Sequence, residues 1–589
     1  MRGETYHAVR RLLAQDAVQA LARCGELLKD DPQDAEAHRL AARALRALKR
    51  DGEAERHELA AIDAAAADDA LQQAAIALLD NRLHLAEPIL RGRLKDNPFD
   101  VAAIRMLAEL AGRIGRNADA ENLLRRALEL APGFTAARVN LATALHRQNK
   151  TAEALAELDR LQDALQGRVN PAYANLRAAV LGRLGDFDEA IALYEDMVRR
   201  VPGQPKIWMS YGHALKTVGR TADSVAAYRR ATALRPAFGE AWWSIANLKT
   251  EPFDAADLAA MEGALHDAQA SVEDRFHLHF ALGKALSDRS EAENAFTHYA
   301  EANRLRRTAQ PYEAARTSRM VDAVIGLSTP DFFAERRDMG CPAPDPIFII
   351  GLPRTGSTLI EQILSSHSQV EGTMELPDLP ALVAELRQEG DWPTMMGDLN
   401  PARLRALGEA YMERTRIQRR EGLPYFIDKL PNNWLHVGLI QLILPHARII
   451  DARRHPLDCG YSNFRQHFAR GQAFSYDLGD IGQYYADYVR LMAHFDMVLP
   501  GRIHRVVHEQ LLDDPEGEVR ALLAALGLPF EEACLRFHEN RRAVRTASSE
   551  QVRRPINRDG EGQWRAVEAR LQPLVAALGP VLDSYPDAP

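Results

Sequence analysis

The feature that most constrains how this chain can fold is a 34-residue period in its first half. Pro98 and Pro132 are 34 residues apart, and so are Pro202 and Pro236. Turn-forming residues recur with nearly the same period: Asn81, Gly115, Asn149, Gly185 and Gly219. Self-similarity at this spacing is typical of stacked supersecondary units, each of which buries its apolar face against its neighbours.

Residues 1–310 are predicted to be helical, because Ala, Leu, Arg and Glu dominate them and apolar residues recur at helical spacing. Each period contains two such helical segments. In PGQPKIWMSYGHALKTVGRTADSVAAYRRATALR, a proline opens the first helix, Gly212 allows close helix approach and Gly219 turns the chain into the second helix. This plan resembles the tetratricopeptide repeat, clearly over residues 64–249 and more loosely elsewhere in 1–310. A plain helical bundle or coiled coil is the alternative, and the regular period disfavours it.

The resemblance implies an all-α solenoid, whose concave surface would bind a peptide or assemble a protein partner. Trp208, Tyr211, Trp242 and Trp243 could line such a groove, although aromatic residues at these positions more often pack one helix against the next. The ligand of the repeats stays unnamed.

Size and composition set outer limits on function. A chain of 589 residues is longer than a single hydrophobic core usually supports, so roughly two to four domains are expected. The formal charge of −9 argues against a general nucleic-acid binder, but a local basic site for a small polyanion is compatible with it.

Cysteine usage and the N-terminal sequence favour a cytoplasmic protein. Cys24, Cys341, Cys459 and Cys534 lie far apart, without a CxxC pair or a disulfide-like framework. The first residues lack the apolar core of a signal peptide, and no window is apolar enough to span a bilayer. We therefore expect reduced thiols and no membrane span.

The pattern changes after residue 310. Four prolines in LSTPDFFAERRDMGCPAPDP break helicity, so we expect a linker over residues 311–344. From 345 to 580 short apolar runs such as PIFIIG, PYFIDK and ARIIDARR alternate with helical patterns. Such alternation predicts an α/β domain with a mostly parallel sheet and P-loop-like βαβ units.

The first of these units contains an anion-binding turn. The strand PIFIIG leads into GLPRTGSTL and then into an amphipathic helix, whose first N–H groups would point at one spot. The spacing Gly351-x-x-x-x-Gly356-Ser357-Thr358 nearly fits the P-loop rule, but Ser357 stands where the phosphate-binding lysine should be. Arg354 supplies a cation instead. Ordinary ATP or GTP hydrolysis is thus disfavoured, and a P-loop kinase or other nucleotide-binding enzyme remains the alternative.

The string FIIGLPRTGSTLIEQILSSHSQVEGTMEL resembles the loop of sulfotransferases that binds 3′-phosphoadenosine 5′-phosphosulfate (PAPS), most closely in the tyrosylprotein sulfotransferase branch. The likeness extends over about residues 345–580. It implies a sulfotransferase that uses PAPS without a metal and releases 3′-phosphoadenosine 5′-phosphate (PAP).

The resemblance also implies roles for individual residues. The 5′-phosphosulfate would be held by Arg354, Thr355, Gly356, Ser357 and Thr358. Glu375 matches the catalytic base, which must take a proton from the attacking hydroxyl. Lys429, at the end of a predicted strand in FIDKLPNNW, matches a lysine that stabilises charge on the departing oxygen. The structural alternative for Lys429 is an ion pair with the adjacent Asp428.

Two later motifs extend the likeness. Arg454 and Ser462, in IIDARRHPLDCGYSNF, fill the places of a 3′-phosphate site, where a guanidinium can contact two oxygens. RTASSEQVRRPIN resembles the loop that covers the nucleotide, with Ser548 as a transition-state serine. The residues of this loop expected at the nucleotide are Ser548, Ser549, Gln551, Val552 and Arg553.

Three positions depart from the closest branch. Gln466 replaces a phosphate-binding arginine, His508 a tyrosine and Gln563 a lysine. The nucleotide contacts therefore cannot all be carried over. Arg553, Arg554 or Arg558 are candidates for the missing charge.

Together these patterns predict direct in-line transfer of a sulfuryl group to an acceptor hydroxyl, without a covalent enzyme intermediate. The acceptor is left open among a tyrosine of a peptide or protein, a glycan and a small metabolite. A non-catalytic tetratricopeptide adaptor with a decayed C-terminal domain is the other alternative, and the presence of Arg354, Glu375, Lys429 and Ser548 argues against it.

Overall fold

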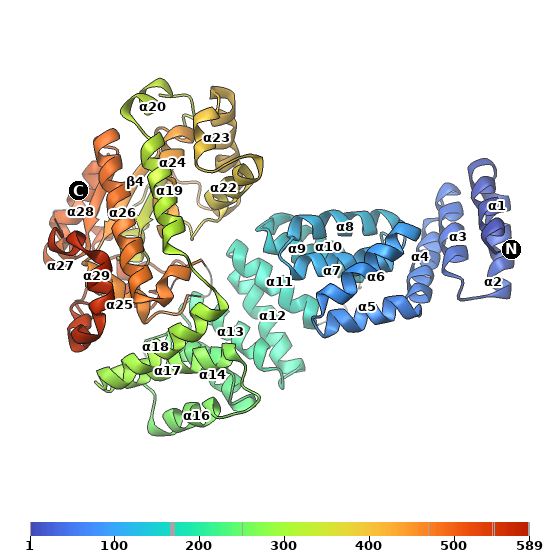
Figure 1. The fold of residues 1–589 in the computed structure, drawn as a ribbon, viewed down its shortest axis with the longest axis horizontal. Coiled ribbons are helices and arrows are strands. Elements are labelled where there is room, and N and C mark those ends of the chain that lie inside the picture. Colours follow the sequence, from blue (N-terminus) through green and yellow to red (C-terminus); the bar gives the residue numbers. More distant parts are fainter. Residues whose placement is uncertain are drawn as a thin grey trace. The chain divides into compact units, whose positions relative to one another are not determined.

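The computed structural model describes residues 2–164, 171–249, 251–468, 471–544, 546 and 548–586. The chain divides into two compact units, residues 1–193 and 194–589. The division falls inside the repeat half, within helix α12 (Phe187–Arg200). In Figure 1 the repeat helices run from blue to green, and the mixed α/β region runs from yellow to red.

The first unit consists of helices in which each packs against the next. They are α1 (Arg2–Gln15), α2 (Ala17–Asp30), α3 (Ala35–Ala47), α4 (Asp51–Ala66), α5 (Asp69–Leu79), α6 (Leu83–Asp96), α7 (Val101–Arg113), α8 (Asn117–Leu130), α9 (Thr135–Arg147), α10 (Thr151–Ala164) and α11 (Pro171–Leu184). Their buried faces are rich in alanine and leucine. The predicted all-α repeat architecture is therefore confirmed.

The predicted turn positions are confirmed by their backbone angles. Asn81, Gly115, Asn149, Gly185 and Gly219 all have φ between 56° and 87°. Glycine and asparagine reach this left-handed region more easily than other residues, so they end one helix and let the chain reverse into the next. The 34-residue period is thus a period of left-handed turns.

The repeated prolines lie in the turn before a helix, not at its first residue. Pro202 precedes α13 (Pro205–Thr217), and Pro236 precedes α15 (Gly239–Ala246). Their carbonyl oxygens accept hydrogen bonds from the indole N–H groups of Trp208 and Trp242, at 2.8 and 2.9 Å. These two tryptophans therefore brace the repeats.

The second unit begins with the remaining repeat helices: α13, α14 (Thr221–Leu234), α15, α16 (Ala255–Leu265), α17 (Val272–Asp288) and α18 (Ala292–Ala309). Close approach depends on small residues, as predicted. A Cβ atom on Gly212 of α13 would lie 2.5 Å from the ring of Tyr228 on α14, and one on Gly283 would lie 2.8 Å from Tyr299. The range 311–344, expected to be a linker, contains α19 (Ala314–Leu327) and α20 (Pro330–Glu335).

The α/β region is built on a parallel five-stranded sheet with the order β2-β3-β1-β4-β5. Its strands are β1 (Pro346–Gly351), β2 (Val370–Gly372), β3 (Tyr425–Asp428), β4 (Arg448–Arg453) and β5 (Ile503–Val507). Its helices are α21 (Ser357–Leu364), α22 (Asp378–Glu389), α23 (Pro401–Thr415), α24 (Val437–Ile443), α25 (Pro456–Phe464), α26 (Leu478–Val498), α27 (His508–Asp513), α28 (Pro515–Ala525), α29 (Gln572–Leu578) and α30 (Pro580–Asp583). The predicted α/β fold is confirmed.

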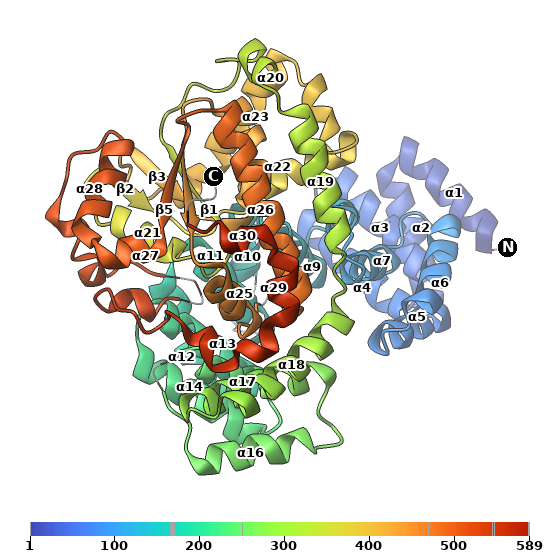
Figure 2. The ribbon, with the colours of Figure 1, turned by 60° about the vertical axis from the view of Figure 1, so that its left-hand side comes forward.

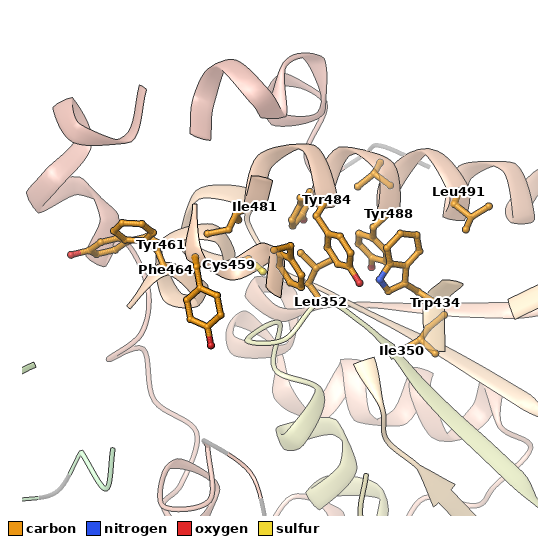
Figure 3. Close-up of a cluster of buried hydrophobic side chains, with 14 of the residues drawn as sticks. Ile350, Leu352, Trp434, Cys459, Tyr461, Phe464, Ile481, Tyr484, Tyr488 and Leu491 are labelled. Carbon is orange, nitrogen blue, oxygen red and sulfur yellow. The ribbon is translucent and has the colours of Figure 1, made fainter. Parts of the chain in front are cut away.

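Side chains alternate between the two faces along each strand, and helices cover both faces of the sheet. Ile347 and Ile349 of β1 belong to a core that includes residues of α21 and α28. Phe348 and Ile350 belong to a second core with α24 and α26. Figure 2 shows helices on either side of the strands, and Figure 3 shows Ile350 and Leu352 near Tyr484, Tyr488 and Trp434.

Within the second unit, the last repeat helices and the α/β region share one hydrophobic core. The ring of His467 packs against Trp243, Phe276 and Phe280. The buried amide of Asn303 on α18 donates to the carbonyl oxygen of Phe464 at 2.8 Å. Among the described residues, no helix has the length and apolar character needed to cross a membrane.

Candidate active site

The anion-binding turn connects β1 to α21 and depends on glycine at two points. Gly351 has φ of +138°, and a Cβ there would lie 2.5 Å from the carbonyl oxygen of Ala452 on β4. Gly356 has φ of +93°, and its Cβ would lie 2.7 Å from Nδ1 of His508. The turn is therefore packed closely against its neighbours, and it aims the N–H groups at the start of α21 toward one spot.

Arg354 joins three motifs that are far apart in the sequence. Its Nε donates to Ser462 Oγ at 3.0 Å, one terminal nitrogen donates to Ser548 Oγ, and the other donates to Gln551 Oε1 at 3.3 Å. All three partners are uncharged. Burial and the neighbouring guanidinium groups of Arg454 and Arg465 lower the pKa of Arg354 to about 10.

Arg454 follows β4 and lies beside the turn, because β1 and β4 are neighbouring parallel strands whose carboxyl ends meet at one edge of the sheet. Its guanidinium donates to the carbonyl oxygen of Arg354 at 3.2 Å and to that of Gly560. The same guanidinium lies 3.8 Å from Asp458 Oδ1. Two cations, Arg354 and Arg454, thus lie close together at this edge of the sheet.

Arg354, Arg454 and the first residues of α21 line a cavity of about 650 Å³. This volume is within the range of small-molecule sites. Its cationic lining side chains are Lys249, Lys284, Arg354, Arg454, Arg465 and Arg554. Its acidic ones are Asp288, Glu550 and Asp559. Asp288 pairs with Lys284 and Asp559 with Arg554, while Glu550 accepts a hydrogen bond from Thr221. The cavity therefore carries an excess of positive charge.

Glu375 and Lys429 form an ion pair beyond the ends of β2 and β3, and neither residue is among those that line the cavity. Lys429 directly follows β3, and its Nζ lies 2.5 Å from Glu375 Oε1. The lysine is 1% exposed, whereas the glutamate side chain is 45% exposed. A buried ammonium thus holds a carboxylate that solvent, and so an acceptor hydroxyl, can reach.

The structural alternative for Lys429 is not observed. Asp428 accepts a hydrogen bond from the hydroxyl of Tyr411 at 2.8 Å, and Lys429 pairs with Glu375 instead. Successive side chains of a strand point to opposite faces, which separates Asp428 from Lys429. Burial raises the pKa of Asp428 to about 8.

Glu361 and Arg542 support the ion pair and were missed by sequence reasoning. Glu361, on α21, is 2% exposed. Its carboxylate lies 2.8 Å from a terminal nitrogen of Arg542 and 3.9 Å from Lys429 Nζ. Arg542 also donates to the carbonyl oxygen of Thr373, two residues before Glu375, at 2.9 Å. The one signal for this network was an acidic residue inside the apolar run LIEQIL.

The remaining predicted residues divide between the cavity and its surroundings. Ser357, Thr358, Ser462 and Val552 line the cavity together with Ser548 and Gln551. Thr355 donates to the carbonyl oxygen of Leu352 at 2.8 Å inside the turn, and Ser549 is 1% exposed. Arg553 donates to the carbonyl oxygen of Thr217, at the end of α13. Its guanidinium therefore binds the repeat helices.

The three residues that differ from the tyrosylprotein sulfotransferase pattern also contact other residues of this chain. Gln466 donates to Asn247 Oδ1 at 3.1 Å, and Gln563 accepts from Arg465. Burial lowers the pKa of His508 to about 3, so this imidazole is neutral beside the turn. Of the candidate cations, Arg554 lines the cavity, and Arg558 pairs with Asp513 and Glu561 on the surface.

Comparisons with known proteins match separate parts of the chain to two families. Residues 346–532 match the Sulfotransferase family, and residues 113–180 and 175–237 match tetratricopeptide repeats. An uncharacterized protein of Aquifex aeolicus is 30% identical over 421 residues, which are 69% of this chain and 54% of that protein. The chain thus spans about half the length of that relative.

Two further proteins each match part of this chain. Protein-tyrosine sulfotransferase 1 of Danio rerio is 25% identical over 282 residues, which cover 44% of this chain and 74% of that protein. The sulfotransferase domain of the Synechococcus PCC 7002 olefin synthase is 21% identical and covers 39% of this chain and 90% of that domain, with a TM-score of 0.30.

Proposed function

We propose that the sulfotransferase family domain, which this chain carries behind its tetratricopeptide repeats, transfers a sulfuryl group from PAPS to an acceptor hydroxyl. The observation that carries the proposal is the junction at Arg354, where the turn, Ser462 and Ser548 meet at a cavity with excess positive charge. PAPS has a 3′-phosphate and a 5′-phosphosulfate, which suit such a cavity.

In the proposed reaction the acceptor oxygen forms a bond to sulfur while the bond between sulfur and the phosphate oxygen breaks. Glu375 takes the hydroxyl proton, and PAP leaves. Lys429 and Arg354 stabilise the negative charge that develops on the departing oxygen. Protein cations thus supply the charge neutralisation that a P-loop enzyme obtains from its lysine and Mg²⁺.

The role of Glu375 is tested by Glu375→Gln in the full chain. The amide cannot accept the proton, so the rate of transfer from PAPS should fall about 100-fold or more, while PAP affinity stays unchanged. Radiolabelled sulfuryl transfer and calorimetric PAP binding measure the two effects. Glu409→Gln, an exposed position on α23, is the control and should behave like the wild type. Activity that survives Glu375→Gln would assign the base to another residue.

The donor is tested by thermal unfolding with nucleotides. PAP should raise the unfolding midpoint, whereas ATP with Mg²⁺ should not, because the turn lacks the P-loop lysine. The reverse pattern would favour a kinase and would contradict the proposal.

For the acceptor we propose a tyrosine hydroxyl of a peptide or protein. The similarity to a protein-tyrosine sulfotransferase and the repeats, a type of fold that binds peptides, support it. Transfer of labelled sulfuryl groups from PAPS into a native lysate, followed by identification of the labelled product, tests it. Label on a glycan or a small metabolite would assign another acceptor.

A further inference from the structure

The cavity beside the anion-binding turn is completed by helices of the repeat array. Its lining includes Arg354, Ser357 and Ser462 of the α/β region. It also includes Trp243 of α15, Lys249 just after that helix and Lys284 of α17. All of these residues belong to the same compact unit.

Specific contacts hold the end of α15 against this cavity. Asn247, which caps α15, accepts the hydrogen bond from Gln466 at 3.1 Å. Trp243 is buried against His467. Two residues beyond Asn247, Lys249 adopts a left-handed backbone with φ of +64°, and its side chain lines the cavity. The end of α15, from which Lys249 follows, is therefore held by residues of the α/β region.

The charges around Lys249 favour an anionic ligand. Arg354, Lys216, Arg465 and Lys284 are the charged groups that act most strongly on it, and all are cations. Burial and these neighbours lower the pKa of Lys249 well below its usual range. A phosphate or sulfate group in the cavity would offset this repulsion between cations.

We propose that Lys249, a residue of the repeat array, is a donor-binding residue that contacts an anionic group of the phosphoadenosine donor. The inference rests on the proposed function, because it takes the cavity as the donor site. The repeat array is then part of the enzyme's donor site, and this role is separate from the binding of a protein partner.

The test compares PAP and adenosine binding to the full-length wild type and to Lys249→Met by calorimetry. PAP affinity should fall about tenfold or more, as expected for loss of a hydrogen bond to a charged group, whereas adenosine affinity should stay unchanged. Lys249→Arg should retain most of the PAP affinity because it keeps the charge. Lys206→Met, at an exposed position on α13, is the control.

The outcomes separate this inference from the proposed function. If the wild type fails to bind PAP, both are wrong. If the wild type binds PAP and Lys249→Met binds it equally well, the donor role of Lys249 is wrong while the proposed function stands. An effect of Lys249→Met on the acceptor KM alone would place the lysine at the acceptor and also overturn the inference. An equal loss of PAP and adenosine affinity would show a structural role instead.

Discussion

At the scale of single residues, the anion-binding turn depends on backbone angles that side chains disfavour. Gly356 combines φ of +93° with close packing against His508. Because the turn orients both its N–H groups and Arg354, a change in its backbone should alter the contacts that we propose for the donor. Strain here should therefore affect binding as well as stability.

We expect Gly356→Ala to weaken PAP binding strongly and to destabilise the second unit by about 1–3 kcal/mol, the usual cost of such backbone strain. Calorimetry and chemical denaturation measure the two effects. Gly326→Ala on α19 is the matched control, since its new methyl group meets no atom within 4 Å and its φ is ordinary. Wild-type affinity in Gly356→Ala would contradict the geometry of the turn.

Asp428 should make stability depend on pH. Folding raises the pKa of this buried carboxyl to about 8, from about 3.9 in the unfolded chain. Between these values the folded protein holds a proton that the unfolded chain has released, so the contribution of Asp428 to the free energy of unfolding falls as pH rises.

The amide of Asp428→Asn does not titrate, so this variant lacks the loss of stability that Asp428 causes in the wild type. The stability of the variant relative to the wild type should therefore increase from pH 5 to pH 8. Thermal midpoints at several pH values measure this difference, and Glu409→Gln, at an exposed position on α23, is the control. A difference that does not change with pH would show that Asp428 keeps its ordinary pKa.

At the scale of elements, α21 connects the two parts of the site. Its first residues, Ser357 and Thr358, line the cavity, and Glu361 lies one turn further along beside Arg542 and Lys429. One short helix thus carries both the anion-binding end and the carboxylate that supports the ion pair.

Glu361→Gln should destabilise the protein by about 3–5 kcal/mol, because it leaves the largely buried Arg542 without its carboxylate, whereas Lys429 keeps Glu375. Turnover should also fall, since Lys429 and Arg542 lose the group that positions them. Denaturant unfolding and transfer assays test both effects. Glu385→Gln, which breaks an exposed pair with Arg414, is the control and should cost at most about 1 kcal/mol. Equal effects of the two changes would contradict a special role for Glu361.

At the scale of the whole molecule, the boundary between compact units falls inside the repeats and not at the start of the α/β region. Helices α13–α18 share a core with that region, and the loop that carries Ser548 contacts α13 through Val544 and Arg553. The cavity therefore belongs to a compact unit that includes repeat helices.

This division predicts that PAP stabilises only part of the chain. All six tryptophans lie in the second unit, so tryptophan fluorescence follows that unit alone, whereas far-ultraviolet circular dichroism follows both. PAP at 100 times its Kd should stabilise the fluorescence-detected unit by about 2.7 kcal/mol. A component of the dichroism transition should stay unshifted. A shift of the entire dichroism transition would show that the two units unfold as one.

The sequence by itself determined the features that depend on local chemistry. The period of Asn and Gly residues predicted the turns because a left-handed backbone favours these residues. The strand–turn–helix pattern at residues 346–364 and the matched motifs pointed to Arg354, Glu375 and Lys429. Their placement follows from short-range rules of strand alternation and helix starts.

Only the tertiary structure decided which distant residues meet at the anion-binding turn. Glu361 pairs with Arg542, Gln466 with Asn247 across 219 residues, and Lys249 enters a cavity of the α/β region. No local pattern marks these contacts, since helical spacing alone makes Lys249 an ordinary repeat lysine. They arise because α15–α18 share the core of the α/β region, and packing brings their charges to the site.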